Sequence, residues 1–322
     1  MNHHLRIVFM GTPDFAVATL KALVENNYKV VGVITAPDKP AGRGQSIQQS
    51  AVKKYATEQN LNVLQPEKLK DPIFIEELKA LNADIQIVVA FRMLPEIVWN
   101  MPPKGTFNLH ASLLPQYRGA APINWAIING EKETGATTFF LTHEIDTGKI
   151  IFHDKITINE NDNAGIVHDN LMEMGAKLVL KTMTAIEQNN FPEIDQSETI
   201  KKETVLKSAP KIFKNDCRIN WKKSTLAVYN LIRGLSPYPT AWSELQLPDG
   251  KILSAKIYET SIGEYYGSFP IGSIVSDGKS YLNVIVSDGS LSIKEIHLEG
   301  KKRLKIEEFL RGFQHVNNCK FI

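Results

Sequence analysis

The chain contains little cysteine and no long hydrophobic segment. Its 322 residues include two cysteines, Cys217 and Cys319, which fit neither a disulfide framework nor the spacing of zinc ligands. No segment approaches the roughly 20 apolar residues that a membrane-spanning helix needs. The opening MNHHLRIVFMG also lacks the pattern of a secretory signal peptide. We therefore expect a cytoplasmic protein that has no membrane partner and no structural zinc.

What the chain does contain is an ordinary globular composition with an uneven charge distribution. Hydrophobic residues make up 43% of it, and its length is enough for two domains. Residues 201–322 hold 19 Lys and Arg against 12 Asp and Glu, an excess of +7; subtraction from the totals of 37 and 35 leaves 18 against 23, or −5, for residues 1–200. A basic final third suits a polyanionic partner, although lysines that only keep the surface soluble would give the same excess.

Strands and helices alternate through the first half of the chain. Apolar runs typical of buried strands occupy residues 5–11, 29–35, 83–90, 105–111, 135–142 and 149–158. Helical spacing of apolar residues occupies 15–27, 50–59, 72–81, 120–129 and 163–188. This alternation predicts an α/β fold with a doubly wound, mainly parallel, Rossmann-like sheet. Asp14 is expected to cap the first helix.

The second half has a different pattern. Polar residues dominate 190–207, which we interpret as a linker. Beyond a helix at 225–235, short β-rich segments separated by Gly, Asp and Ser occupy residues 241–247, 252–260, 281–287 and 290–297. They predict a second, smaller β-barrel domain of OB-like type. The expected domains are therefore residues 1–189 and 208–322.

Two segments of the first half are placed to meet anions. MGTPDFAV (10–17) follows the first strand, where open α/β sheets bind ligands, and its backbone amides can hold an anion. It is not G-x-G-x-x-G, so a nicotinamide dehydrogenase is poorly supported. The long segment TAPDKPAGRGQSIQQS (35–50) carries Lys39 and Arg43, which can meet phosphates. A plain strand–helix connection and a disordered loop are the alternatives.

The segment TFNLHASLLPQYRG (106–119) places an amide and an imidazole two positions apart. In a strand, the period of two puts Asn108 and His110 on one face and their apolar neighbours on the other. Both side chains can then donate hydrogen bonds to one carbonyl oxygen, which stabilises an oxyanion. Ser112 has no second histidine beside it, so we expect a nucleophile supplied by a substrate. A structural histidine is the alternative.

A carboxylate follows in HEIDTGKII (143–151). Asp146 lies in a turn between two predicted strands, and carboxylates in such loops can reach the end of a neighbouring strand. Near His110 it would favour the protonated ring. Asn108, His110 and Asp146 would then form a set that handles protons during acyl-type transfer. A role in forming the turn alone is the alternative for Asp146.

These residues together resemble the folate-dependent formyltransferase family. FNLHASLLPQYRGAAPINWAI, from residue 107, is similar to the family's Asn-x-His followed by S-L-L-P-x-Y-R-G, and DTG at 146–148 is similar to its aspartate turn. The resemblance covers essentially the whole chain. Members that act on methionyl-tRNA are the most similar, in the segments FMGTPDFAV, PDKPAGRG, KIFKNDCRINW, IRGLSPYPTAW, EGKKR and EFLRG.

The resemblance implies a reaction and its participants. The formyl donor would be 10-formyltetrahydrofolate, with no metal. The acceptor would be the α-amine of methionine on initiator methionyl-tRNA, and the product would serve translation initiation. The enzyme is expected to be a monomer.

The resemblance also implies roles for particular residues. Residues 1–189 would form the catalytic domain, and the barrel would bind tRNA. The residues that match the catalytic trio are Asn108, His110 and Asp146. Those that match the folate-contacting segment are Ser112, Leu113, Leu114 and Pro115. The expected tRNA contacts are Thr12, Pro13, Phe15, Lys39 and Arg43.

Three other activities stay open at this point. A formyltransferase that acts on a sugar-nucleotide amine or a glycinamide nucleotide would share the chemistry, but it does not explain the basic barrel or residues 35–50. A formyl-folate hydrolase would use water in place of the amine. A non-catalytic tRNA-binding protein would not need the trio.

Overall fold

The computed structural model describes residues 3–41, 46–200, 205–264, 267, 269–313 and 316–322. Two compact units account for the chain. The first consists of Met1–Gly119, Thr134–Ile156 and His168–Ser208. The second consists of Ala120–Glu133, Thr157–Val167 and Ala209–Ile322.

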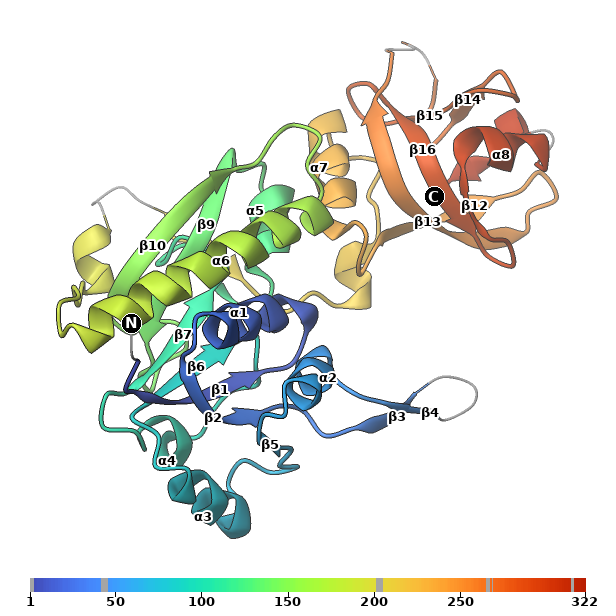
Figure 1. Ribbon diagram of the computed structural model, residues 1–322. Helices are drawn as coiled ribbons and strands as arrows, with labels where there is room; N and C mark the ends of the chain where they lie inside the picture. Colours follow the sequence, from blue (N-terminus) through green and yellow to red (C-terminus); the bar gives the residue numbers. More distant parts are fainter. Residues whose placement is uncertain (1–2, 42–45, 201–204, 265–266, 268, 314–315) are drawn as a thin grey trace. The chain divides into compact units, whose positions relative to one another are not determined.

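A seven-stranded sheet forms the centre of the first unit, with strand order β10-β9-β7-β6-β1-β2-β5 (Figure 1). Strands β1, β2, β5, β6 and β7 pair in parallel, and β9 runs antiparallel to β7. The mainly parallel α/β sheet predicted from the sequence is therefore confirmed. The strands are β1 (Arg6–Gly11), β2 (Lys29–Ile34), β5 (Val63–Leu64), β6 (Ile85–Val89), β7 (Thr106–His110), β9 (Glu133–Phe140) and β10 (Ile150–Thr157).

The direction of winding changes between β1 and β6. Strand β1 pairs with β2 on one side and with β6 on the other, so the chain builds the sheet outward in two directions. Open α/β sheets bind ligands beside such a switch point, at the carboxyl ends of the strands. Strand β7 pairs with β6 and ends at His110. The polar pair of β7 therefore lies near the place where this fold binds ligands.

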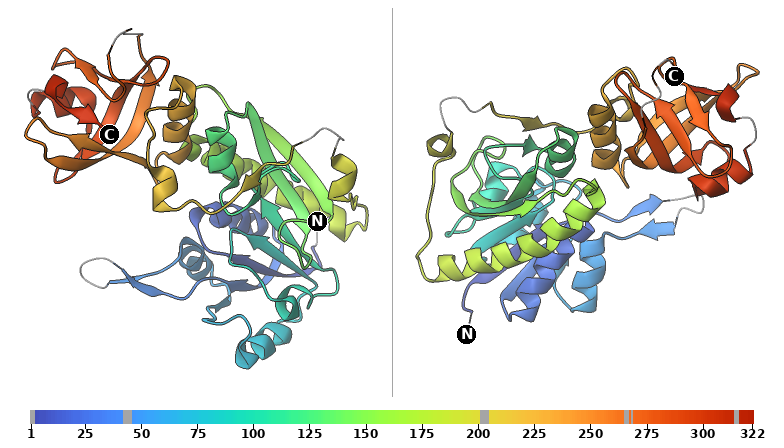
Figure 2. Two further views of the ribbon diagram at one scale, coloured as in Figure 1. Left: turned by 180° about the vertical axis from the view of Figure 1, so that it is seen from behind. Right: turned by 90° about the horizontal axis from the view of Figure 1, so that it is seen from above.

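Helices cover the sheet, as the two further views in Figure 2 show. They are α1 (Asp14–Glu25), α2 (Ala51–Glu58), α3 (Pro72–Ala80), α4 (Glu96–Trp99) and α6 (Ala164–Glu187). Helix α6 packs closely on β7, because a Cβ at Gly175 would lie 2.8 Å from Leu109 Cδ2. Thr182 of α6 also hydrogen-bonds Thr138 of β9 at 2.9 Å. The sheet is thereby held rigid beneath the ends of its strands.

Two helices begin with a side-chain cap, and a third begins without one. Ser50 Oγ accepts a hydrogen bond from the Lys53 amide at the start of α2, and Asp71 does the same for the Ile73 amide at the start of α3. The prediction that Asp14 caps α1 is wrong. Pro13 is the N-cap and makes no side-chain bond, while Asp14 is the first helical residue. There its charge still faces the positive end of the helix dipole.

A hairpin replaces most of the loop expected at 35–50. Strands β3 (Lys39–Ala41) and β4 (Ser46–Gln48) pair antiparallel and extend from the first unit in Figure 1. The base of the hairpin is held by Asp38, which accepts hydrogen bonds from Lys53 Nζ at 2.5 Å and Gln65 Nε2 at 2.8 Å. These bonds lower the pKa of the Asp38 carboxyl. Arg43 lies outside the described residues.

The second unit contains an antiparallel sheet that is nearly closed on itself. Its order is β14-β15-β16-β13-β12-β18, with β17 paired to β16. An antiparallel bridge between Ser273 and Lys320 joins the two ends of this order. The second, smaller barrel expected from the sequence is therefore confirmed. The strands are β12 (Ala241–Gln246), β13 (Ile252–Ile262), β14 (Ile274–Ser276), β15 (Leu282–Ile285), β16 (Ser290–Leu298), β17 (Arg303–Lys305) and β18 (Lys320–Phe321).

Three helices belong to the second unit: α5 (Pro122–Ile128), α7 (Thr225–Leu235) and α8 (Ile306–Arg311). Helices α5 and α7 are in close contact, since a Cβ at Gly234 would lie 2.7 Å from Ile128 Cγ1. Arg233 of α7 is buried and donates hydrogen bonds to Asn230 Oδ1 at 2.8 Å and Asp162 O at 2.9 Å. Burial lowers the pKa of this guanidinium. Residues 120–133 and 157–167 thus pack with the last third of the chain.

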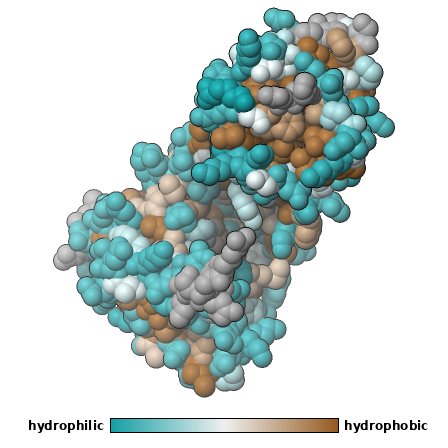
Figure 3. All heavy atoms as spheres, turned by 90° about the vertical axis from the view of Figure 1, so that its right-hand side faces the viewer, coloured by the Kyte–Doolittle hydropathy of each residue, from teal (hydrophilic) through white to brown (hydrophobic). Residues whose placement is uncertain are grey.

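The surface matches the composition. On the face shown in Figure 3, hydrophilic residues cover much of each unit, with hydrophobic residues between them. Over the residues that the structure describes, no helix has both the length and the apolar character needed to cross a membrane.

Substitution of Phe107 tests the packing of the core beneath Asn108 and His110. Its side chain is 0% exposed in the centre of the sheet. We expect Phe107→Ala to lower the free energy of unfolding by about 3–5 kcal/mol, through lost burial and the cavity left behind. Urea titration followed by circular dichroism measures this loss. Ile73→Ala, at a side chain 73% exposed, is the control and should change stability by less than about 0.5 kcal/mol. Equal effects of the two substitutions would contradict the packing described for β7.

Candidate active site

The end of β7 presents Asn108 and His110 on one face. Asn108 is flanked by Val88 of β6 and Phe139 of β9, while His110 lies opposite Thr137. The alternate residues of β7 are buried in the core, as expected. The Asn108 side chain is partly exposed and makes no hydrogen bond to another described residue. Its amide is therefore available as a donor.

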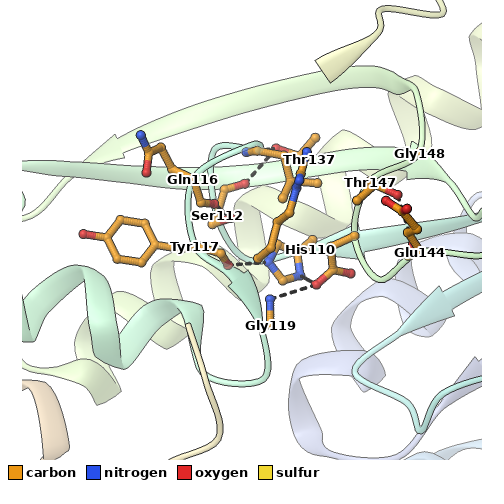
Figure 4. Close-up of polar contacts among 12 residues, drawn as sticks. His110, Ser112, Gln116, Tyr117, Gly119, Thr137, Glu144, Thr147 and Gly148 are labelled. Atoms are coloured by element: carbon orange, nitrogen blue, oxygen red, sulfur yellow. Dashed lines mark hydrogen bonds and ion pairs between the residues drawn. The ribbon is translucent and has the colours of Figure 1, made fainter. Parts of the chain in front are cut away.

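One nitrogen of His110 is engaged by the main chain. His110 Nε2 lies 2.9 Å from Tyr117 O (Figure 4). A carbonyl oxygen only accepts, so Nε2 carries a proton and donates it to this bond. Tyr117 reaches this position with φ of 59°, a left-handed conformation that costs a non-glycine residue roughly 1–2 kcal/mol. The bond fixes the orientation of the ring and leaves Nδ1 as its second functional atom.

Asp146 lies beside that second nitrogen. Its Oδ2 is 3.7 Å from His110 Nδ1, and the two side chains are only 13% and 7% exposed. The same oxygen accepts a hydrogen bond of 2.9 Å from the Gly119 amide in β8 (Arg118–Gly119). The structure therefore brings the three residues of the expected trio to one end of β7, and their catalytic roles stay a prediction.

The turn that carries Asp146 is tight. It connects β9 to β10, and Asp146 adopts φ of 56° within it. A Cβ at Gly148 would lie 1.7 Å from Phe140 O, so only glycine fits there. The Asp-Thr-Gly sequence thus combines the Asp146 carboxylate with the glycine that lets the turn close.

Thr137 connects the loop after β7 to the neighbouring strand. Its hydroxyl donates to Ser112 O at 2.7 Å and accepts from the Leu114 amide at 3.2 Å. Ser112 Oγ donates in turn to Gln116 O at 2.6 Å, as Figure 4 shows. These bonds fix the loop whose carbonyl at Tyr117 holds the histidine ring.

The expected folate-contacting residues differ in what they can offer a ligand. Ser112 is buried, and its hydroxyl is used within the loop. Leu114 is buried against Phe139 and Ile150. Leu113 packs over Gly135, where a Cβ would approach within 2.5 Å of its side chain. Any contact of this segment with a ligand would therefore rely mainly on its main chain and on Pro115.

The expected tRNA contacts also differ in exposure. Thr12 is partly exposed and Pro13 is exposed at the start of α1, and Lys39 is exposed at the base of the hairpin. Phe15 is buried, with its ring 5.2 Å from that of His168. Phe15 is thus a core residue of this unit.

Several groups at the site carried no signal in the sequence analysis. The Tyr117 carbonyl and the Gly119 amide belong to the segment 106–119. They are main-chain groups, so the side-chain pattern of the sequence does not predict their roles. The buried Gln196 lies in the segment interpreted as a linker and donates to Asp146 O at 2.9 Å. Among the described residues, no three His, Cys, Asp or Glu side chains gather as metal ligands do.

Chemically, the site can stabilise a negative charge on a carbonyl oxygen. Asn108 offers an amide donor, and His110 presents Nδ1 on the same face of the strand. The Asp146 carboxylate lies 3.7 Å from that nitrogen.

Proteins of known sequence and structure are similar to the chain over most of its length. A methionyl-tRNA formyltransferase of Bacteroides thetaiotaomicron is 60% identical over 310 residues, 96% of each chain. One of Parabacteroides distasonis is 59% identical over 313 residues, 97% of each chain. The solved N-formyltransferase of Helicobacter canadensis, in complex with folinic acid and dTDP-3-aminofucose, is 24% identical, with a TM-score of 0.65 over 90% of this chain and 98% of that one. The last comparison supports the fold alone.

Both parts of the chain match models of one family. Residues 5–183 match the model described as formyl transferase, and residues 211–314 match that of the formyl transferase C-terminal domain. The first match alone covers more than half of the chain and includes the end of β7 and the Asp146 turn. The chain therefore belongs to the formyl transferase family.

Proposed function

We propose that the enzyme transfers the formyl group of 10-formyltetrahydrofolate to the α-amine of methionine on initiator methionyl-tRNA. The product would be N-formylmethionyl-tRNA for translation initiation. This proposal rests on a sequence identity of about 60%, over nearly the whole chain, to relatives named methionyl-tRNA formyltransferase. The proximity of Asp146 to His110 supports it. The folinic acid in the Helicobacter canadensis structure supports a folate as donor.

The reaction would begin with attack of the amine on the formyl carbon. Because α-amino groups titrate at about 7.7–8.0, a useful fraction of the amine is neutral near neutral pH. The attack turns the carbonyl oxygen into an oxyanion, which Asn108 and protonated His110 stabilise. Asp146 lies beside His110 Nδ1. The attacking amine loses a proton, and N10 of the folate takes one up as its bond to the formyl carbon breaks. Holding both substrates in place supplies much of the acceleration.

The remaining roles are assigned by the same proposal. Residues 1–189 form the catalytic domain, 190–207 the linker and 208–322 the tRNA-binding domain. Ser112 to Pro115 contact the folate, and Thr12, Pro13, Lys39 and Arg43 contact the tRNA. Phe15, the remaining expected contact, is buried and would take part only if the tRNA uncovered its ring. The excess of +7 in residues 201–322 supports a polyanionic partner. The enzyme acts in the cytoplasm as a monomer and needs no metal.

An acceptor assay tests the activity as a whole. The enzyme is given 10-formyltetrahydrofolate together with charged initiator tRNA, a sugar-nucleotide amine, a glycinamide nucleotide, or water alone. We expect formyl release only with the charged tRNA, because the amine of that substrate is the proposed nucleophile. Equal release with water would identify a hydrolase, and release with a small amine alone would identify a different acceptor. No release in any mixture would favour a non-catalytic tRNA-binding protein.

Asn108→Ala tests the oxyanion site. We expect turnover to fall by about 10²–10³-fold, as it does when an oxyanion donor is lost, with tRNA binding unchanged. Single-turnover formylation measures the first quantity and filter binding the second. Asn100→Ala, at a residue outside the site at the end of α4, is a matched control. Normal turnover in Asn108→Ala with intact tRNA binding would remove Asn108 from the mechanism.

Substitution of Lys39 and Arg43 tests their proposed contact with tRNA. The double substitution Lys39→Ala with Arg43→Ala should weaken tRNA binding and flatten its salt dependence, since each phosphate contact adds to the slope of affinity against salt. Affinity measured from low to moderate salt gives both quantities. Lys21→Ala with Lys29→Ala removes two exposed charges elsewhere in the first unit and controls for net charge. Unchanged affinity and slope in the Lys39 and Arg43 variant would exclude these two contacts.

A further inference from the structure

Gln196 is a buried amide whose hydrogen-bonding capacity is fully used. Its side chain is 2% exposed, at the start of the short 3₁₀ helix η1 (Gln196–Thr199). Nε2 donates to Asp146 O at 2.9 Å and to Gly148 O at 2.8 Å. Oε1 accepts from Arg118 Nε at 3.1 Å and from Arg118 Nη2 at 2.6 Å. Two donor hydrogens and two acceptor lone pairs thus all have partners.

The partners of Gln196 lie in the two segments that hold Asp146. Two of them are carbonyls of the turn that carries this residue. The third, Arg118, directly precedes Gly119, whose amide holds Asp146 Oδ2. One side chain therefore ties the main chain of the turn to the strand that holds its carboxylate. Both supports of Asp146 depend on it.

Gln196 is itself held firmly against β10. Ile194, two residues before Gln196, exchanges two backbone hydrogen bonds with Ile150, of 2.8 and 2.9 Å. Asp195 accepts hydrogen bonds from the Ser197 amide and hydroxyl, which lower the pKa of its carboxyl. The first residues of η1 are therefore a fixed support and not a free tether.

We propose that Gln196, with Arg118, is a positioning residue that sets the distance between the Asp146 carboxylate and His110 Nδ1, and this role rests on the function proposed above. The position needs a side chain that both donates and accepts. Glutamate at neutral pH has no N–H to give to the two carbonyls, and methionine has neither a comparable donor nor acceptor. Without these bonds the turn would shift and carry the Asp146 carboxylate away from His110 Nδ1.

A double-mutant cycle with Asp146 tests this role. Gln196→Met should lower kcat by about 10–100-fold, the scale of a misplacement near 1 Å in an active site, with little change in the KM of either substrate. In an Asp146→Asn background the same substitution should have little further effect, because the carboxylate through which it acts is gone. Gln196→Glu, which keeps the acceptor for Arg118, provides a second variant of the same length.

Controls separate positioning from loss of folding. Glu198→Gln changes an exposed residue of the same 3₁₀ helix, whose side chain makes none of the bonds that hold Asp195 or Gln196, and should leave kcat unchanged. Thermal unfolding of every variant shows whether the fold is retained. Full additivity with Asp146→Asn, or an equal fall for Glu198→Gln and Gln196→Met, would overturn the proposal.

A readout without turnover keeps this test separate from that of the proposed function. In enzyme labelled with ¹⁵N-histidine, the His110 signals are assigned by their loss in a His110→Gln variant. Gln196→Met should shift the Nδ1 signal in the same direction as Asp146→Asn does. An unshifted signal in a folded Gln196→Met variant would overturn the positioning role. A wild-type enzyme that forms no formylated product would overturn the proposed function instead.

Discussion

The contact between His110 and Asp146 is the interaction on which the site depends. It joins the end of a central strand to a turn between two later strands, and both side chains are almost buried. A charge in such a place interacts strongly with a partner but costs free energy when it has none. The Gly119 amide and the imidazole ring both lie against the Asp146 carboxylate and stabilise it. Loss of either partner leaves a buried charge poorly compensated, which makes the arrangement sensitive to small shifts.

Main-chain geometry provides this arrangement more than side-chain packing does. Tyr117 and Asp146 both adopt positive φ, at roughly 1–2 kcal/mol each for a non-glycine residue. Glycine would avoid that cost, but at 146 it would remove the carboxylate. Strain of this kind persists where surrounding bonds fix the backbone, and here those bonds come from Thr137, Gln196 and Gly119. The rigid loops are thus a requirement of the site.

The sequence was informative wherever a pattern repeats along the chain. Continuous apolar runs located the strands of the first sheet, and the period of two placed Asn108 and His110 on one face. The sequence did not predict elements of two or three residues, such as β3, β5 and β18, because they are too short to show a period. The capping role of Asp14 failed because Pro13 already supplies the extended residue before the helix. The barrel was predicted, but its closure at Ser273 and Lys320 joins segments distant in the chain.

The parts of the site that the sequence did not predict depend on contacts between distant segments. Asp146 was predicted as a partner of His110, but no pattern gives its distance, since that depends on how the β9–β10 turn folds back. Gln196 was missed for the same reason, with the added difficulty that its neighbours are polar and typical of a linker. Only the burial of an amide with four hydrogen bonds distinguishes it from them.

The bond from His110 Nε2 to Tyr117 O also constrains the proposed chemistry. To exchange a proton through Nε2, the ring would have to leave a carbonyl without its donor in a buried place, which costs roughly 1–3 kcal/mol. Any proton that His110 shares with a substrate therefore passes through Nδ1, the atom that faces Asp146. At 3.7 Å the carboxylate lies beyond hydrogen-bonding distance of Nδ1, so it leaves this nitrogen available to a substrate.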